Sequence, residues 1–348
     1  MKLSKIKSFT SCIVIFLYCQ NVFAQKTDSV AENMLIYQRS SGGWAKSLSL
    51  WPINYNRRLT ADQKMAVLSN NVHYEATIDN DATTPEISYL VKAYKQTGNK
   101  VYLASAQKGI DYLFKSQYDN GGWPQFYPLK KGYYTHITYN DNAMVHVMQL
   151  LQSIEDGTDG FDVVDKSYIP KARRAVVKGI NCFLKTQVNV NGKLTVWCAQ
   201  HDEHTLLPAP ARAFELVSLS GLESVPIVEF LMTIKNPSPE IKRSIISAVE
   251  WFDKSKITGY DFIVINDPSQ PVKGQDAVVV ADQKSTIWAR FYDINTNEPF
   301  FVGKDGIARK KVSEIENERR AGYSWYGKWA AKLLAKEYPE WLKKNGAN

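Results

Sequence analysis

One segment of this chain occurs twice, and the repetition limits the folds that the chain can adopt. Residues 108–123 read KGIDYLFKSQYDNGGW, and residues 178–192 read KGINCFLKTQVNVNG. A fainter copy, AVEWFDKSK, occupies residues 248–256, and residues 38–44 (QRSSGGW) match residues 117–123 (QYDNGGW). Repetition at a fixed period indicates an architecture built from equivalent units.

Each copy has the apolar spacing of a helix. Ile110, Leu113 and Phe114 continue a stripe at three- and four-residue intervals, and the second copy repeats it. A further helical pattern precedes each copy, which predicts helices over residues 82–96, 142–154 and 223–234, the first of them ending at Gly98. Strand patterns are confined to short pieces such as 194–197 and 262–265.

The repeated unit is therefore a pair of helices followed by a long connection. Such hairpins either stack into an open solenoid or close into a ring. Long irregular connections are usually functional, and we expect a closed all-α toroid whose loops lie on one face. No Ser-, Gly- or Pro-rich linker interrupts the chain, so residues 25–348 are predicted to form a single domain.

Residues 1–24 have the pattern of a cleaved signal peptide. Lysines at positions 2, 5 and 7 precede a short apolar run and a small-residue site ending at Ala24. The run is too short to span a bilayer, so we expect a secreted or periplasmic protein without stable membrane insertion.

The charge and the aromatic content favour an acidic or sugar-based partner. The formal charge is +8, and cleavage removes three lysines, which leaves +5. A basic protein attracts polyanions, but the chain has no basic arm or nucleic-acid motif, so an acidic polysaccharide is expected rather than nucleic acid. Of the two cysteines that remain, Cys182 lies on an apolar helix face, which favours buried thiols over a disulfide with Cys198.

Clusters of polar residues precede the first helix of each unit. They are Asp79-Asn80-Asp81, Asn140-Asp141-Asn142, and Ser218–Ser220 with Glu223. Helix capping explains one acid at each position, and it explains the first two clusters less well. If the hairpins are arranged alike, the helix starts meet on one rim and bring carboxylates together. That would form a cation site of oxygen ligands.

A dense polar segment, residues 197–222, reads WCAQHDEHTLLPAPARAFELVSLSGL. His201 and His204 flank Asp202 and Glu203, and a zinc site can be drawn from them. No third ligand has metal-site spacing, however, so hydrogen bonding within the loop is the favoured role of the two histidines.

Eight segments, in order, resemble the pectate lyases of polysaccharide lyase family 10. They are TIDNDAT (77–83), NGGWPQFYPL (120–129), TYNDNAM (138–144), WCAQHD (197–202), ARAFELVSLSG (211–221), WARFYDI (288–294), GKDG (303–306) and RRAGYSWYG (319–327). The resemblance implies an (α/α)3 toroid, which agrees with the ring expected from the repeats. It also implies calcium-assisted cleavage of α-1,4-polygalacturonate by β-elimination, by an enzyme that we expect to be a monomer.

The resemblance assigns roles to individual residues. Asp79 and Asp141 correspond to the acidic residues at the calcium and substrate site, and Arg212 to the catalytic arginine that acts as base. Arg290 corresponds to a substrate-binding arginine. Lys304 stands in GKDG where an arginine is expected, and lysine keeps the charge but loses the two-point grip on a carboxylate.

The proposed chemistry explains these residue types. Removing the C5 proton of a galacturonate adds negative charge beside a carboxylate, so cations and a base are needed and a nucleophile is not. Since arginine has a pKa of about 12.5 or above, Arg212 could instead neutralise the substrate carboxylate while another group takes the proton.

Other readings remain open at this stage. Asp79 and Asp141 could be helix caps, Arg290 could be stacked in the core, and most tryptophans are expected to anchor the core rather than touch sugar. The alternative functions are a two-carboxylate glycoside hydrolase on an (α/α) toroid, a non-catalytic polyuronate-binding protein, and a lyase of another uronate polymer. The basic residues Arg212, Arg290 and Lys304 favour elimination from a polyanion.

Overall fold

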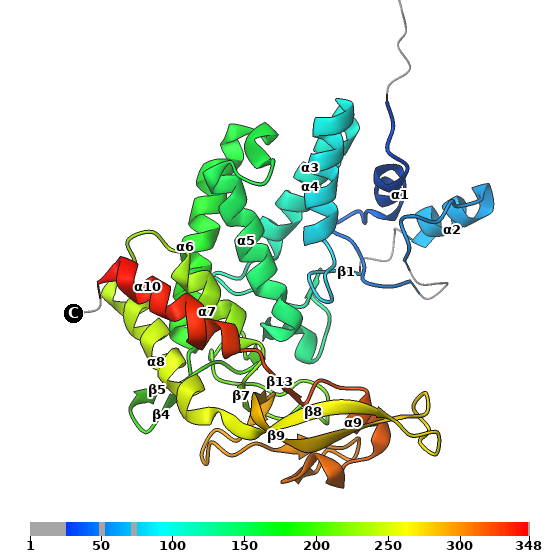
Figure 1. Ribbon diagram of the computed structural model, residues 1–348. Coiled ribbons are helices and arrows are strands. Elements are labelled where there is room, and N and C mark those ends of the chain that lie inside the picture. The colour runs from blue at the N-terminus through cyan, green and yellow to red at the C-terminus, as the bar shows by residue number, and fades with distance from the viewer. Residues whose placement is uncertain (1–25, 49–52, 71–74, 347–348) are drawn as a thin grey trace, which may run out of the picture.

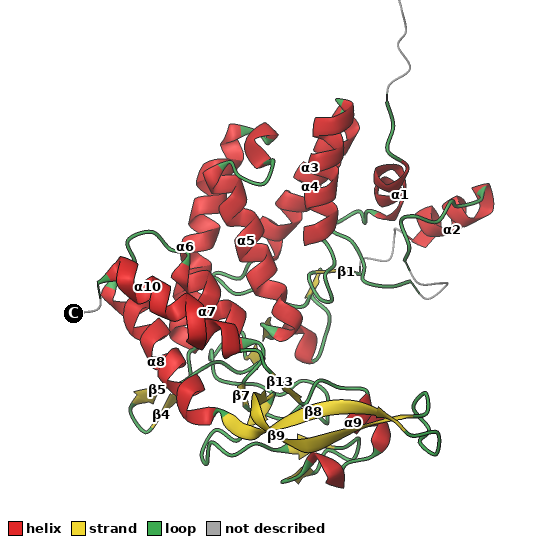
Figure 2. Cartoon of the chain, in the orientation of Figure 1, coloured by secondary structure: helices red, strands yellow, loops and turns green. Residues whose placement is uncertain are grey.

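The computed structural model describes residues 26–48, 53–70 and 75–346. The predicted signal peptide lies outside these residues. Within them, helices dominate one half of the molecule, and a long β-hairpin with most of the short strands lies on the other side (Figures 1 and 2).

Helical hairpins form the body of the fold. Their helices are α3 (Thr84–Thr97) with α4 (Lys100–Ser116), α5 (Ala143–Asp156) with α6 (Ile169–Thr186), and α7 (Ser224–Met232) with α8 (Pro239–Ser255). The first helices contact one another in the order α3, α5, α7, and the second helices contact one another in the order α4, α6, α8 (Figure 1). The three helices predicted to open the units are confirmed, and the closure of the row into a toroid stays a prediction.

Local signals set the helix ends as the sequence indicates. Gly98 has φ 71°, and its N–H bonds to the carbonyl of Tyr94, which ends α3. Asn99 then caps α4 by accepting a hydrogen bond from the N–H of Val101 at 3.1 Å. The two helices are therefore joined by a two-residue turn, and this forces them to lie antiparallel.

Further helices flank this row. They are α1 (Ser29–Tyr37) and α2 (Ala61–Asn70) before it, and α9 (Asn317–Ala321), the π-helical turn η6 (Leu333–Glu337) and α10 (Tyr338–Asn345) after it. Short 3₁₀ turns lie at η1 (Tyr133–Thr135), η2 (Asn140–Asn142), η3 (Phe161–Val163), η4 (Lys166–Tyr168) and η5 (Val312–Glu314). α1 contacts α3 and α4, whereas η6 contacts α7 and α8, so these elements cover opposite ends of the row.

The largest difference from the sequence prediction is a long antiparallel hairpin. β8 (Ile257–Asn266) pairs with β9 (Gln275–Ala289), and β13 (Tyr326–Gly327) adds to β9. The predicted strand over 262–265 is only the middle of β8. Of the predicted strand over 194–197, β5 includes Leu194 alone.

The other strands are two residues long and join loops. They are β1 (Ala76–Thr77) with β2 (Phe126–Tyr127), β3 (Ile137–Thr138) with β6 (Gln200–His201), β4 (Asn189–Val190) with β5 (Lys193–Leu194), β7 (Leu219–Ser220) with β10 (Phe291–Tyr292), and β11 (Phe301–Val302) with β12 (Ala308–Arg309). All these pairs are antiparallel. β1–β2, β3–β6 and β7–β10 each join a loop before one unit to a loop after it.

The repeated sequence connects each unit to the next. Gln38 donates one side-chain hydrogen bond within its own loop and another to the carbonyl of Ser105 in α4. Gln117 does the same toward Ala175 in α6, and Gln187 toward Ser244 in α8. The repeated glutamine therefore bonds the end of one unit to the second helix of its neighbour.

The glycines of the repeated segment allow this close approach. Gly121 has φ +96°, and a Cβ placed on it would lie 2.0 Å from the carbonyl oxygen of Lys178 in α6. Gly42 has φ +104° and has the same relation to Lys108 in α4, at 2.4 Å. No other residue fits at either position without displacing a helix backbone.

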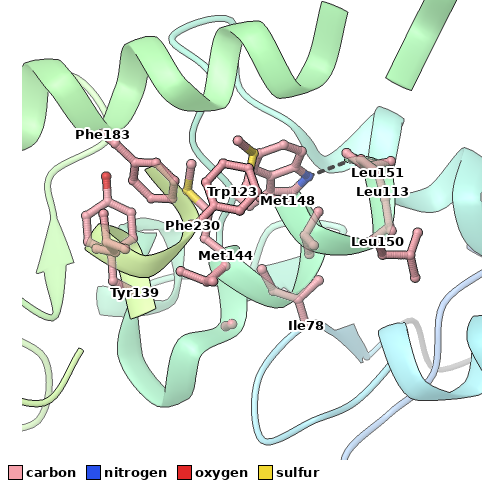
Figure 3. Packing of buried hydrophobic residues seen from close by; sticks show 14 of the residues in the cluster. Ile78, Leu113, Trp123, Tyr139, Met144, Met148, Leu150, Leu151, Phe183 and Phe230 are labelled. Carbon is pink, nitrogen blue, oxygen red and sulfur yellow. Dashed lines mark hydrogen bonds between the residues drawn. The ribbon is translucent and has the colours of Figure 1, made fainter. Parts of the chain in front are cut away.

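The tryptophans of the repeats are core anchors, as predicted. Trp44, Trp123, Trp197, Trp288 and Trp325 are all buried. The indole of Trp123 donates to the carbonyl of Leu113 at 2.8 Å and packs among Met148 and Leu151 (Figure 3). Equivalent indole bonds tie Trp44 and Trp197 to their preceding helices.

A second, smaller core lies in the strand-rich part. Its buried residues are Phe291, Phe301, Val302, Val312, Ile315 and Trp325. Cys182 and Cys198 are free, buried thiols, which confirms the preferred reading of the sequence. None of the helices in the described part of the chain is long and apolar enough to cross a membrane.

Candidate active site

An acidic residue lies shortly before the first helix of each hairpin. Asp79 precedes α3, Asp141 precedes α5 and Glu223 precedes α7. The backbone is left-handed at Asn80 (φ 49°) and again at Asp141 (φ 50°). Non-glycine residues in this region cost roughly 1–3 kcal/mol and gather at functional sites, so the two polar clusters share a strained conformation that capping does not require.

Arg290 joins two of these carboxylates. Its Nη2 atom forms an ion pair with the buried Glu223 and lies 3.7 Å from Oδ1 of Asp141. Pairing of β10 with β7 positions this side chain, because the N–H of Gly221 bonds to the carbonyl of Arg290 at 2.9 Å. Glu223 also accepts a hydrogen bond from Ser220, so it is held from two sides.

The ionisation of Asp141 reflects this neighbourhood. Burial raises the pKa of Asp141 above its usual value; Arg290 opposes the shift, and the charges of Asp79 and Glu223 add to it. Three carboxylates from three hairpins therefore lie within electrostatic reach of one another. The structure brings Asp79, Asp141 and Arg290 together, as the argument from the repeats expected for the helix starts.

Lys46 is a member of this site that the sequence reasoning missed. Its ammonium group forms an ion pair with Oδ2 of the buried Asp79. Oδ1 of Asp79 is buried and has no hydrogen-bond partner in the described residues. Lys46 belongs to the segment GGWAKS, which follows the first tryptophan of the repeats; this position in the repeat was the available signal.

Arg212 lies on a loop at the edge of this site and is half exposed. Its Nε donates to Oε2 of Glu215 at 2.9 Å, and this hydrogen bond raises the pKa of the guanidinium above its usual range. The pKa of Glu215 is lowered because the hydrogen bond and charge of Arg212 together outweigh the effect of burial. Arg212 is thus fully protonated while this pair is intact.

The loop of Arg212 adjoins the loop of Asp141. Asn140, Ala211, Glu215 and Tyr323 line one small cavity of about 20 Å³. Tyr323 also donates a hydrogen bond to Glu215 at 3.4 Å. The predicted base and the acidic cluster therefore share one region of the surface.

Tyr323 and Arg319 are further residues that the sequence reasoning did not find. The guanidinium of Arg290 lies 4.4 Å from the centre of the Tyr323 ring, and that of Arg319 lies 4.3 Å from it. Burial lowers the pKa of Arg319, and its Nη2 has no hydrogen-bond partner among residues whose positions are described. Arg320 beside it forms an ion pair with Asp276.

Lys304 is exposed, and its ammonium group lies 2.5 Å from Oε2 of Glu318. Its turn packs on the loop of Arg212, since a Cβ on Gly306 would lie 2.8 Å from the carbonyl oxygen of Ala213. The structure thus places Lys304 in a loop next to the arginine expected to be the base.

The two histidines of the dense polar segment differ. His201 is buried and bonds through its ring to the N–H of Cys198 and the carbonyl of Leu206, and burial lowers its pKa to about 4. His204 is exposed. The preferred reading of loop hydrogen bonding is therefore confirmed for His201, and the two histidines do not form a common zinc site.

A family model described as pectic acid lyase matches residues 38–334. The chain belongs to the pectic acid lyase family. The prediction of a pectate lyase enzyme is thereby confirmed. A comparison with curated proteins finds no match.

Solved structures of a related enzyme have a similar fold. One is a mutant of a family 10 polysaccharide lyase from Cellvibrio cellulosa, in which alanine replaces an aspartate, in complex with trigalacturonic acid. It has a TM-score of 0.77 and 35% identity, covering 93% of this chain and 94% of that chain. Another, a family 10 polysaccharide lyase from Cellvibrio cellulosa, has the same TM-score and identity and covers 93% of each chain. This pectic acid lyase family member is therefore similar to a polysaccharide lyase over almost its whole length.

Proposed function

We propose that the protein is a secreted, calcium-dependent lyase that cleaves α-1,4-polygalacturonate by β-elimination. The relative bound to trigalacturonic acid supports this substrate class. The signal-peptide pattern of residues 1–24 supports export. We further propose that residues 25–348 form one domain whose hairpins close into an (α/α)3 toroid, as the likeness to the lyase structures suggests.

The observation that carries the proposal is the charge arrangement at the helix starts. Three carboxylates face two cations, Lys46 and Arg290, so the cluster keeps one net negative charge. Two further arginines lie nearby: Arg319 stacks on the Tyr323 ring that Arg290 also contacts, and Arg212 pairs with Glu215. A site that combines uncompensated carboxylates with arginines suits a cation and a polyanion bound together, whereas a hydrolase of neutral glycans has no use for the arginines.

The residues present fit a calcium ion. The available ligands are all oxygen atoms, which Ca²⁺ prefers. Oδ1 of Asp79 is buried, without a hydrogen-bond partner in the described chain, and Asp141 is the most accessible of the three acids. Asp79 and Asp141 would hold the ion, which would lower the energy of the negative charge that develops beside the substrate carboxylate.

The protein's own residues would do the remaining work. Arg290 and Lys304 supply positive charge for the substrate carboxylates, and burial of Arg290 against Tyr323 fixes the direction of its donors. Arg212 would accept the C5 proton. To do so it must first leave Glu215, because that carboxylate holds it protonated.

The ion pair between Arg212 and Glu215 allows a test of whether Arg212 acts as the base or only neutralises the substrate carboxylate. In Glu215→Gln the anionic partner is lost, so the pKa of Arg212 falls. If Arg212 is the base, the alkaline pH at which activity rises moves to lower pH in the variant. If Arg212 only neutralises the substrate, the pH profile keeps its position, and the assignment as base is refuted.

The decisive assay is the ultraviolet absorbance of an unsaturated uronide when the purified protein is mixed with polygalacturonate. We expect a rise that chelator abolishes, that calcium restores and that is lost in Arg212→Ala. New reducing ends without the absorbance would indicate a hydrolase. No product at all would leave another uronate polymer or a binding protein as the function.

A further inference from the structure

A second cluster of side chains that could hold a metal ion lies outside the candidate active site. His136, Asp202 and Glu203 each offer one ligand atom, and these atoms all lie within 4.8 Å of one another. All three residues are partly buried. The acids proposed for calcium take no part in this cluster.

Strand pairing brings the three residues together. In the antiparallel ladder of β3 and β6, Ile137 lies opposite His201. The next position outward therefore places His136 opposite Asp202, with Glu203 beside it. The side chain of Asn120 donates to the carbonyl of Glu203 at 2.7 Å and fixes the backbone there. The cluster is thus built by residues distant in sequence.

The carboxylates are oriented before any ion binds. Oδ1 of Asp202 accepts hydrogen bonds from the N–H groups of His204 and Thr205 and from the hydroxyl of Thr205, at 2.7–3.0 Å. These bonds leave Oδ2 of Asp202 for another partner. An oxygen of Glu203 lies 3.0 Å from Nδ1 of His136, in the place where an ion could replace a proton between them.

We propose that His136, Asp202 and Glu203 bind one divalent transition metal of the zinc type. Imidazole nitrogen and carboxylate oxygen are both ligands of Zn²⁺, whereas Ca²⁺ takes oxygen ligands. Zinc needs its ligands about 2.0–2.2 Å away, so ligand atoms within 4.8 Å of one another close around it by small side-chain movements. A water molecule or the exposed His204, which lies 3.8 Å from Glu203, completes the four positions.

The site would tie two loops together. His136 belongs to the loop after β2, and Asp202 begins the segment that leads to the predicted base. That segment is closed by hydrogen bonds between Asp202 and Leu207 and between Gln200 and Ala209. The metal therefore has a structural role in holding the segment that ends at Arg212, and it does not depend on the proposed reaction.

The test is a calorimetric titration of the chelator-treated, full-length protein with Zn²⁺, in excess Ca²⁺ so that the acidic cluster is occupied. We expect one equivalent to bind, and His136→Ala to weaken binding by at least about tenfold. His146→Ala is the matched control, because His146 pairs with a carboxylate of Asp81 at 3.1 Å but lies outside the cluster. It should bind as the wild type does.

Glu203→Gln keeps the shape of the side chain and serves if His136→Ala does not fold. It should also weaken Zn²⁺ binding by at least about tenfold. Bound zinc should raise the thermal unfolding midpoint of the wild type, and at the same zinc concentration it should raise that of the variants less. Failure of the wild type to bind one equivalent, or equal affinity in wild type and variants, would overturn the proposal and leave a simple His136–Glu203 ion pair.

Discussion

The contact of Gly121 with the neighbouring unit allows a quantitative test of how the units are joined. In Gly121→Ala, the new Cβ would lie 2.0 Å from the carbonyl oxygen of Lys178, in a helix backbone that cannot move alone. The φ of +96° is also unfavourable for alanine. The substitution therefore adds two separate costs, one from backbone conformation and one from steric overlap.

Gly132 provides the control that separates them. Its φ is +92°, close to that of Gly121, but a Cβ there would meet nothing within 4 Å. Gly132→Ala should therefore cost only the conformational part, roughly 1–3 kcal/mol. Gly121→Ala should cost that amount and about 1–3 kcal/mol more, the usual range for overpacking.

The assay is urea unfolding of both variants and the wild type, followed by fluorescence and by circular dichroism. Coincident transitions are needed before midpoints are converted to free energies. Gly121→Ala should unfold at clearly lower urea than Gly132→Ala. If the two variants unfold within about 0.5 kcal/mol of each other, the size usual for a substitution away from any close contact, the close approach of the units does not contribute as the structure indicates.

Three further predictions concern charge. Burial, together with Glu337, raises the pKa of Glu229 to about 7. The free energy of unfolding should therefore fall as pH rises from about 4.5 to about 7, and Glu229→Gln should flatten this change in a urea series. Lys46→Met removes the cation beside the buried Asp79, so half-maximal activity should need several-fold less calcium. Lys130→Met is the control: it removes another lysine that lies over the ring of Phe126, and it should leave the calcium requirement unchanged. Lys304→Arg should lower KM for polygalacturonate a few-fold in steady-state kinetics, because arginine holds a carboxylate through two bonds, and an unchanged KM would place Lys304 away from substrate.

The helical part of the fold was predictable because its signals are local. The 3.6-residue apolar period and the glycine after α3 are read from adjacent residues, and α3, α5 and α7 begin within two residues of the predicted starts. Equivalence of the repeats then placed Asp79 and Asp141 in matching polar clusters before their helices. One repeat aligned with another thus yields tertiary information that a single helix does not.

The missed features depend on contacts between distant residues. Lys46 reaches Asp79 across 33 positions, and Arg319 is defined by stacking on Tyr323 and on rings elsewhere in the second core. The β8–β9 hairpin was underestimated for another reason. The outer half of β8 is largely exposed, so the alternation of apolar and polar residues that marks a half-buried strand is weak there.

The glutamine and glycine connectors have a consequence for substrate choice. The glutamines bond to helix carbonyls of the neighbouring unit, and the glycines let its backbone approach closely. Both therefore set the spacing between hairpins through the backbone, independently of the side chains on the loop face. That spacing is also the interval between the acids at successive helix starts. The proposed substrate is a polymer that carries one charge on every sugar. The protein that would bind it carries an acidic residue at the start of every hairpin. Gln38, Gln117 and Gln187 would then fix the distance between successive charged groups of the protein. Residues remote from the polymer would thereby help decide which polymer fits.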